Sequence, residues 1–242
     1  MRAGEGLHPS SRGVRVRFEN GTPTVTDGPF AETKELVAGF TMIEVGSQDD
    51  AVEWVKRWPV EDAGGNTTIE IRETGCAIGL PSVNAGEQAA NGALKRFMVL
   101  VHADDNTEAA IDPGAARLGA MQQANEDSAR AGILIAAEGL QPSSKGARVA
   151  FSGGKPAVID GPFAEARELV AGFWMIQAST QADAVDWALR YPYPFKNNAI
   201  VDVRKVYEAA DFGDAFTPEL QVAEERMRAH LLESGKPLGA EP

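Results

Sequence analysis

Apolar residues with helical spacing mark two stretches of the chain, and each stretch begins at a hydroxyl residue and ends at a proline. Ser47 and Thr180 are each followed three residues later by an aspartate, an acidic version of the capping box that begins a helix. Behind each cap the apolar residues recur at i, i+3, i+4 and i+7, the spacing of one buried helix face: Ala51, Trp54, Val55 and Trp58 first, then Ala184, Trp187, Ala188 and Tyr191. Pro59 and Pro192 end the two predicted helices, whose apolar stripes we assign to the core rather than to a bound cofactor.

Apolar or alternating runs between turn signals predict the strands. In the first part of the chain they cover 15–18, 24–26, 36–45 and 67–72, and in the second part 97–101, 148–151, 157–159, 169–178 and 200–206. The dipeptides Asn20-Gly21 and Gly153-Gly154 predict the turns of two hairpins. A further helix is expected over 113–131, between Asp112-Pro113 and Gly132, and a last one over about 218–233.

The two parts of the chain repeat each other. Residues 5–45 align with 138–178 at a constant offset of 133, and 27 of these 41 positions are identical. After one deletion the similarity returns where Ile71-Arg72 matches Val203-Arg204. The longest shared phrase is DGPFAETKELVAGF at 27–40, which returns as DGPFAEARELVAGF at 160–173. Such self-similarity predicts two structural copies in one chain.

The second copy has a strand and a helix at its front, 97–101 and 113–131, for which the first copy has no counterpart. The longer copy therefore follows the order β-α-β-hairpin-β-α-β, the split βαβ or ferredoxin-like pattern with an inserted hairpin, which predicts an α+β fold. We divide the chain into a shortened first copy (1–75), a linker rich in glycine, alanine and asparagine (76–94), a complete second copy (95–213) and a C-terminal helix and tail (214–242).

The repeated phrase carries a family resemblance. With DGPFAETKE at 27–35, and with EGLHPSS and EGLQPSS at 5–11 and 138–144, the chain resembles YCII-related proteins of the DGPF type. The resemblance implies ferredoxin-like domains that pair sheet against sheet as a dimeric α+β barrel, so a tandem copy looks like that dimer fused into one chain. Some relatives are similar to dehydrochlorinases or lactone isomerases and are thought to use a His–Asp pair, but the helix expected over 113–131 contains no histidine.

The shortened first copy raises the question of what completes its sheet. In the ferredoxin-like order the first strand lies between the third and the fourth, so its loss leaves backbone groups of two strands unpaired. The C-terminal helix covering the apolar face, contacts from another chain, and a natural start before Met1 are three possible answers, of which we favour the last.

Composition and charge limit the classes of partner and cofactor that we expect. The formal net charge is −12, which disfavours nucleic acid as a direct partner, and no apolar run is long enough to span a membrane. Cys76 is the only cysteine and the first residues contain no secretory signal, so a cytoplasmic location is expected. One cysteine and three scattered histidines make no zinc pattern, and no glycine-rich phosphate loop follows a strand, so we expect neither a metal nor a cofactor.

Asp27 and Asp160, which begin the shared phrase, are candidate general bases or ligand acceptors. The competing interpretation, which we favour, is that an aspartate before Gly-Pro belongs to a turn and binds nearby backbone N–H groups. Lys34 and Arg167 are candidate anion contacts, with Glu32 and Glu165 beside them, although alternating charges usually mark a solvated face.

Glu5 and Glu138, with Ser10 and Ser143 in the loops that follow, are candidate ligand-binding residues. Their hydroxyl and carboxylate groups could hydrogen-bond a small polar molecule, and the competing interpretation is loop structure alone.

Histidine is scarce. His8 is replaced by Gln141 in the second copy, so it cannot be a base required in both copies, and His230 is expected to be exposed. His102 ends the strand at 97–101 beside Asp104 and Asp105, so it is a candidate for acid–base work, against the alternative of a solvated strand end.

We therefore expect a small-molecule-binding protein whose cleft is lined by the DGPF turn and the EGLxPSS loop, and an enzyme of lyase or isomerase type is one form of this hypothesis. Asp160 would be the base, Arg167 the anion contact and Glu138 a positioning group. The alternative is a non-catalytic accessory module, for which the resemblance implies a sigma factor as partner. A third possibility is an assembly protein whose sheets pair, either within the chain as a pseudo-dimer or in a homodimer.

Overall fold

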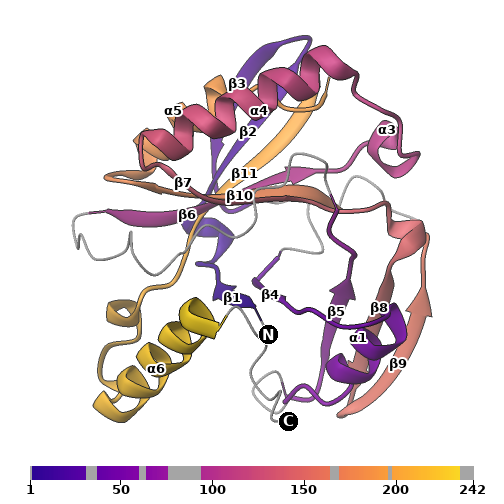
Figure 1. Cartoon of the computed structure of the whole chain (residues 1–242), viewed down its shortest axis with the longest axis vertical. Helices are drawn as coiled ribbons and strands as arrows, with labels where there is room; N and C mark the ends of the chain where they lie inside the picture. Colours follow the sequence, from indigo (N-terminus) through magenta and orange to yellow (C-terminus); the bar gives the residue numbers. More distant parts are fainter. Residues whose placement is uncertain are drawn as a thin grey trace.

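The computed structural model describes residues 2–30, 37–59, 64–75, 94–163, 169–195 and 198–234. They form helices and antiparallel sheets, which confirms the α+β class (Figure 1). The first copy contributes β1 (Ala3–Gly6), η1 (Ser10–Arg12), β2 (Val14–Glu19), β3 (Thr22–Asp27), β4 (Gly39–Met42), α1 (Gln48–Val55) and β5 (Thr67–Ile71). From the second copy come β6 (Lys95–His102), α3 (Asp105–Glu108), α4 (Ala115–Arg130), β7 (Leu134–Gly139), η3 (Ser143–Lys145), β8 (Ala147–Ser152), β9 (Lys155–Asp160), β10 (Val170–Ala178), α5 (Gln181–Arg190) and β11 (Ala199–Lys205), followed by η5 (Ala209–Ala215) and α6 (Pro218–Ser234).

The largest sheet has six strands in the order β3-β2-β11-β6-β10-β7. Helices α4 and α5 lie on one face of this sheet (Figure 1). The apolar stripe of α5 packs there against outward-facing residues of the strands, including Val99, Val101 and Trp174, so the stripe forms core as its spacing predicted. Thr180 caps α5 through a reciprocal pair of hydrogen bonds with Asp183.

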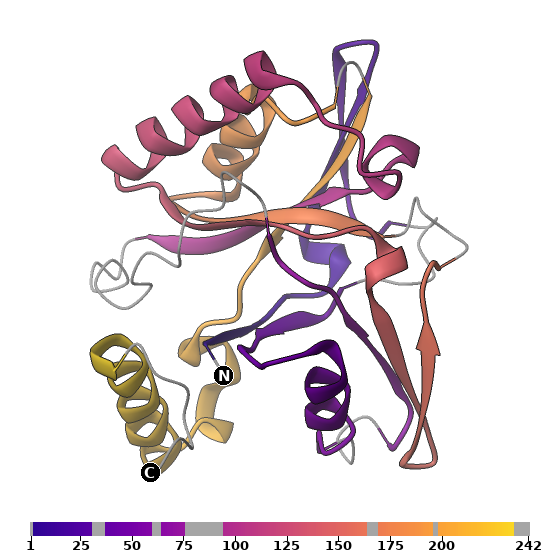
Figure 2. The same cartoon turned by 45° about the vertical axis from the view of Figure 1, so that its right-hand side comes forward.

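A three-stranded sheet, β5-β8-β9, lies apart from the large one and carries α1 on its surface (Figure 2). Val52 and Val55 of the helix pack against Ala147, Val149 and Phe151 of β8. A third, two-stranded sheet pairs β1 with β4.

The hairpins are exchanged between the two copies. Strand β2 of the first copy pairs with β11 of the second, with Val16 opposite Val201. Strand β8 of the second copy pairs in the same way with β5 of the first, with Val149 opposite Ile69. Each hairpin therefore extends the sheet of the other copy, and the two exchanges are related by the sequence repeat.

The inner faces of the sheets meet at the centre. Met98, Leu100, Phe173 and Met175 of the large sheet form a second apolar core, against which Phe40 of β4 packs. Phe40 and Phe173 occupy equivalent positions in the two copies, and their ring centroids are 5.2 Å apart. This contact between equivalent residues places an approximate twofold axis between them.

The two copies differ in the middle of their sheets. In the second copy β6 lies between β10 and β11 and pairs with both. The counterparts of β10 and β11 are β4 and β5, and in the described part of the chain no strand lies between them. The first copy is therefore divided into two separate sheets where the second has one.

Helix α6 lies away from the large sheet and from α1 in both views (Figures 1 and 2). Its described side chains are mostly exposed. No helix in the described residues, α6 included, has the length and apolar character needed to cross a membrane.

Candidate functional site

The two shared phrases of each copy pack against each other. The N–H of Gly28 donates to the carbonyl of Gly13 at 2.9 Å, and Gly161 repeats this bond to Gly146 at 3.0 Å. A Cβ atom on Gly28 would lie 1.7 Å from the carbonyl oxygen of Ser10, and one on Gly161 would lie 1.8 Å from that of Ser143. The DGPF turn thus requires glycine because the EGLxPSS loop approaches it so closely, which gives the repetition of both phrases a structural reason.

An arginine on each exchanged hairpin connects these phrases to the other copy. The guanidinium carbon of Arg15 lies 4.4 Å from the ring centroid of Phe30 in the DGPF turn. The same arginine donates from Nε and Nη2 to the two carboxylate oxygens of Asp202 on β11, at 2.6 and 2.8 Å. This bidentate pair is buried, since Arg15 is 8% exposed and Asp202 is 3% exposed.

His102 shares the same aspartate. Its Nε2 lies 3.1 Å from Oδ2 of Asp202, and its side chain is buried. Burial alone would raise the pKa of Asp202, but the hydrogen bonds from Arg15 and His102 outweigh burial and hold the pKa below its ordinary value. Because an ionised carboxylate only accepts hydrogen bonds, the contact with Asp202 is consistent with a hydrogen on Nε2.

Arg204 adds a second guanidinium beside this pair. It donates from Nε to the carbonyl of His8 at 3.0 Å, in the loop before Ser10. Burial lowers the pKa of Arg204; the charge of Asp202 opposes this effect and the charge of Arg15 adds to it. We call Ser10, Arg15, His102, Asp202 and Arg204 the histidine cluster; with two guanidinium groups and one carboxylate it has a surplus of positive charge.

The equivalent residues of the other half form a second cluster. Arg148 stacks on Phe163 at 4.3 Å and donates from Nε to Glu70 of β5 at 3.0 Å. Arg72 donates to the carbonyl of Gln141, as Arg204 does to that of His8, and Nη1 also reaches Glu70 at 2.9 Å. These contacts repeat the histidine cluster with glutamate in place of aspartate and with no described histidine.

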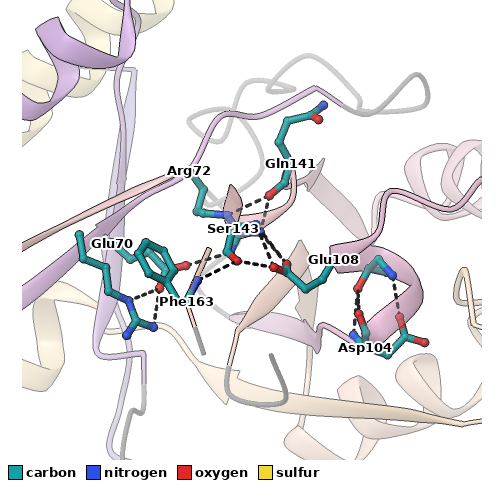
Figure 3. A network of polar contacts seen from close by, with 9 residues as sticks. Glu70, Arg72, Asp104, Glu108, Gln141, Ser143 and Phe163 are labelled. Carbon is teal, nitrogen blue, oxygen red and sulfur yellow. Dashed lines mark hydrogen bonds and ion pairs between the residues drawn. The ribbon is translucent and has the colours of Figure 1, made fainter. Parts of the chain in front are cut away.

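Glu108, the last residue of α3, completes this second cluster (Figure 3). Its carboxylate accepts hydrogen bonds from the N–H and the hydroxyl of Ser143, with an N–O distance of 3.0 Å, and it lies 3.4 Å from Arg72. The Ser143 hydroxyl in turn accepts from the N–H of Phe163 at 3.3 Å. We call Glu70, Arg72, Glu108, Ser143 and Arg148 the glutamate cluster.

A cavity of about 1970 Å³ opens on the glutamate cluster. Residues of α1, β4, β5 and β6 line it, together with Glu70, Arg72 and Arg148. The C-terminal region also contributes to the lining, with Phe212 of η5, Phe216 directly after η5, and residues of α6. The α6 residues that line this cavity, Gln221, Glu224 and Glu225, are all polar.

Glu5 and Glu138 are equivalent in sequence but differ in their partners. Glu5 forms an ion pair with Arg96 at the start of β6, and Arg96 also binds Glu208. Burial would lower the pKa of Arg96, but these two carboxylates raise it. Glu138 is half-buried, and its pKa is raised because burial disfavours its charged form.

The other predicted site residues lie in several places. Asp27 and Asp160 are exposed at the ends of β3 and β9 and do not line the cavity. Ser10 and Ser143 are buried at the phrase contacts. Glu32, Lys34, Glu165 and Arg167 lie outside the described residues.

His102 lies where a polar site was expected, but the expected partners and the solvated alternative are wrong. Asp202, which is 100 residues away in sequence, binds the ring, and the side chain is only 8% exposed. Asp104 instead caps α3 through the N–H of Thr107. The strand places His102 on the inner face of the sheet, whereas Asp104 follows after the strand has ended.

Sequence reasoning missed Arg15 and Asp202. Their signal was a charged residue at an inner position of an otherwise apolar strand in both copies, Arg15 with Arg148 and Asp202 with Glu70. A buried charge requires a partner, so the repeated charges could have been paired. Within the described residues no group of three or more histidine, cysteine or acidic side chains could hold a metal ion.

Comparison with known proteins gives a family. The family model of the YCII-related domain matches residues 4–74 and 96–210, one match in each copy. The chain is also 40% identical over 50 residues to an uncharacterized protein, R00369, of Rhizobium meliloti (strain 1021). That match covers 21% of this chain and 40% of the relative, so the chain spans less than half of the relative's length.

Proposed function

The chain belongs to the YCII-related family, and we propose that it binds a small carboxylate at the histidine cluster and transfers a proton through His102. The proposal includes a fused form of the dimeric α+β barrel, in which the exchanged hairpins bring the cluster together from both copies. It replaces Asp160 as the expected base with a buried histidine that an aspartate orients.

One observation carries the proposal. In the glutamate cluster the carboxylate of Glu108 occupies the N–H and hydroxyl of Ser143 and lies near Arg72. The histidine cluster repeats these donors in Ser10 and Arg204. Among the described residues no carboxylate is hydrogen-bonded to either donor, and Asp202 acts on Arg204 only through its charge. In the glutamate cluster, the carboxylate of Glu108 thus takes the position that we propose for the ligand carboxylate in the histidine cluster.

The chemistry follows from the charges. A ligand carboxylate beside Arg204 and Ser10 balances the positive surplus and lies near the imidazole that Asp202 orients. His102 takes a proton from the ligand carbon next to the carboxylate onto Nδ1, and the negative charge that develops on the ligand is stabilised by the guanidinium groups. Returning the proton to another carbon gives an isomerase, and losing a leaving group gives a lyase. The accessory role with a sigma factor stays a prediction.

Thermal unfolding with acetate, glycolate, pyruvate and benzoate tests the binding step, with sodium chloride at equal ionic strength as the reference. We expect a saturable rise in melting temperature for at least one acid, because a ligand that binds the folded state stabilises it. Ser10→Ala should abolish the rise, whereas Ser143→Ala, the equivalent change in the glutamate cluster, should leave it. An equal rise in both variants would contradict the proposal.

Glu108→Ala provides a second test, because it removes the internal carboxylate. Acetate should restore part of the lost melting temperature in this variant, as a free ligand takes the place of the side chain. For the proton-transfer step, nitrogen-15 spectra of the histidine ring should show His102 with the hydrogen on Nε2 at neutral pH. A neutral His102 with its hydrogen on Nδ1 would remove it as the proposed base.

A further inference from the structure

Strand β4 has one edge that no described strand pairs with. The carbonyls of Ala38 and Met42 accept from the N–H groups of Leu7 and Arg2, at 2.8 and 2.7 Å. Backbone groups of successive strand residues point to opposite sides, so those of Gly39 and Thr41 point away from β1. Strand β5 presents a similar edge. In its counterpart β11, the backbone groups of the even-numbered residues face β6, as the hydrogen bond from the N–H of Val206 to the carbonyl of Arg96 shows. The equivalent backbone groups of β5 therefore face the side on which no described strand lies.

In the second copy β6 fills the equivalent position. It is antiparallel to both neighbours, with Val99 opposite Trp174 of β10 and opposite Val203 of β11. Its side chains are apolar on both faces, with Phe97, Val99 and Val101 on the helix side and Met98 and Leu100 on the inner side. The repeat therefore defines which kind of segment fits between two such edges.

The space between β4 and β5 belongs to the cavity of about 1970 Å³ described above. It is lined by Thr41 of β4, by Ile69 of β5, by Trp54 of α1 and by Trp58, which follows the end of α1. Trp187, the counterpart of Trp54, is buried and donates to Ser128 of α4 at 3.0 Å. Trp58 remains 36% exposed, so apolar surface that is covered in one copy is open in the other.

Glu138 gives independent support for a strand between β4 and β5. On the other side of the twofold axis its equivalent, Glu5, binds Arg96 at the start of β6. By the same symmetry, Glu138 would face a residue equivalent to Arg96 in a strand that lies between β4 and β5. Glu138 has no ion-pair partner among the described residues, so it is one half of a pair whose other half the symmetry assigns to that strand.

We propose that the gap between β4 (Gly39–Met42) and β5 (Thr67–Ile71) is an acceptor for an apolar β-strand of another polypeptide. The strand lies antiparallel to both edges and joins the two small sheets into one. About seven residues with apolar side chains on both faces fit it, and a basic residue near its start pairs with Glu138. Backbone bonds to the two free edges supply the affinity, and the alternate side chains supply the specificity.

A synthetic peptide with the sequence of residues 95–102, KRFMVLVH, is the probe, because β6 occupies the equivalent position in the second copy. Titration should give a saturable change in tryptophan fluorescence, since Trp54 and Trp58 line the gap and the peptide contains no tryptophan. Isothermal titration calorimetry then gives the dissociation constant. No saturable binding of this peptide would overturn the proposal.

Two variants make the test specific. Thr41→Pro removes an N–H from the free edge without removing a bond to β1, and it should weaken binding by about tenfold or more. Val25→Pro is the matched control, because Val25 lies on the free edge of β3, on the same side of that strand as the native Pro23. Equal affinity of the two variants would contradict strand pairing in the gap.

The charge pair is tested with Glu138→Gln. This variant should bind the peptide several-fold more weakly than the wild type does. For a peptide in which alanine replaces the arginine, the variant and the wild type should have the same affinity. A weakening that is independent of that arginine would remove Glu138 from the acceptor. If gel filtration shows instead a dimer of this chain that the peptide dissociates, a second copy is the occupant and the assignment to another polypeptide is wrong.

Discussion

The histidine cluster and the glutamate cluster share the same set of contacts but differ in their acidic residue and in its other partner. In each, an arginine from an exchanged hairpin stacks on the phenylalanine of a DGPF turn and binds an acidic residue on the last strand of the other copy. In one the acid is a buried aspartate that also binds His102, and in the other it is a longer, half-buried glutamate that also binds Arg72. The difference has its origin in β6, which supplies the histidine and has no described counterpart in the first copy.

This comparison separates structure from function in the repeated phrases. Both clusters contain the glycine contact and the stacked phenylalanine, which fix the two phrases within a copy, and the arginine–acid pair, which joins one copy to the other. Only one cluster contains a histidine bound to its acid, and that histidine is the group to which the proposed function assigns proton transfer. The two clusters therefore differ in composition, although the sequence repeat is nearly exact in the shared phrases.

The largest expected difference between the clusters is in stability. Asp202→Ala leaves Arg15 and His102 buried without their shared acceptor, and it should lower the free energy of unfolding by about 3–5 kcal/mol. Glu70→Ala should cost about 1–2 kcal/mol, because its arginine partners keep other contacts or reach solvent. Urea unfolding of both variants measures the difference, and equal losses would contradict the asymmetry.

Replacing the arginine of each cluster by lysine should give a smaller difference in stability between the two clusters. Arg15→Lys cannot make the bidentate bond to Asp202 and stacks less well on Phe30, so it should cost about 2 kcal/mol. Arg148→Lys should cost about 1 kcal/mol, since its pair with Glu70 is partly open to solvent. The two variants are compared by the same urea titration, and a larger loss for Arg148→Lys would reverse the assignment of the buried pair.

The pH dependence of unfolding sharpens the comparison further. The pKa of Asp202 is lower in the folded protein than its ordinary value, so its charged form stabilises the fold above about pH 4. As the pH falls through the lowered pKa, both states become protonated and this stabilisation is lost. The difference in unfolding free energy between the wild type and Asp202→Asn should therefore shrink on acidification, and a constant difference would contradict the buried ion pair.

How far the sequence predicts this molecule depends on the distance over which residues interact. Caps, turns and helix stripes are local, so α5 and the two hairpins follow from their residues. The pairing of β2 with β11 does not, because the same hairpin pattern fits the sheet of either copy. The bond between Arg15 and Asp202 joins residues 187 apart and depends on that exchange. His102 could be selected as a candidate, but only the sheet register identifies its partner.

The smallest expected effect concerns the two equivalent glutamates. Because the pKa of Glu138 is raised in the folded state, its charge opposes folding once the pH exceeds its ordinary value. Glu138→Gln should therefore stabilise the protein at pH 7, by about 0.5 kcal/mol after allowance for solvent screening. Glu5→Gln should destabilise it, because Arg96 loses a partner. Thermal unfolding at pH 7 measures the two signs, and the same sign for both would contradict the difference in their partners.

Exchange of the hairpins within one chain is the claim on which both clusters depend, and a disulfide tests it most directly. Arg17 and Ile200 lie opposite each other on β2 and β11 as a non-hydrogen-bonded pair, whose Cα atoms are about 4.5 Å apart in antiparallel sheets. In a Cys76→Ser background, Arg17→Cys with Ile200→Cys should oxidise to an intrachain disulfide that peptide mapping detects in the monomer. Failure to form it, or a bond that joins two chains instead, would contradict the exchange.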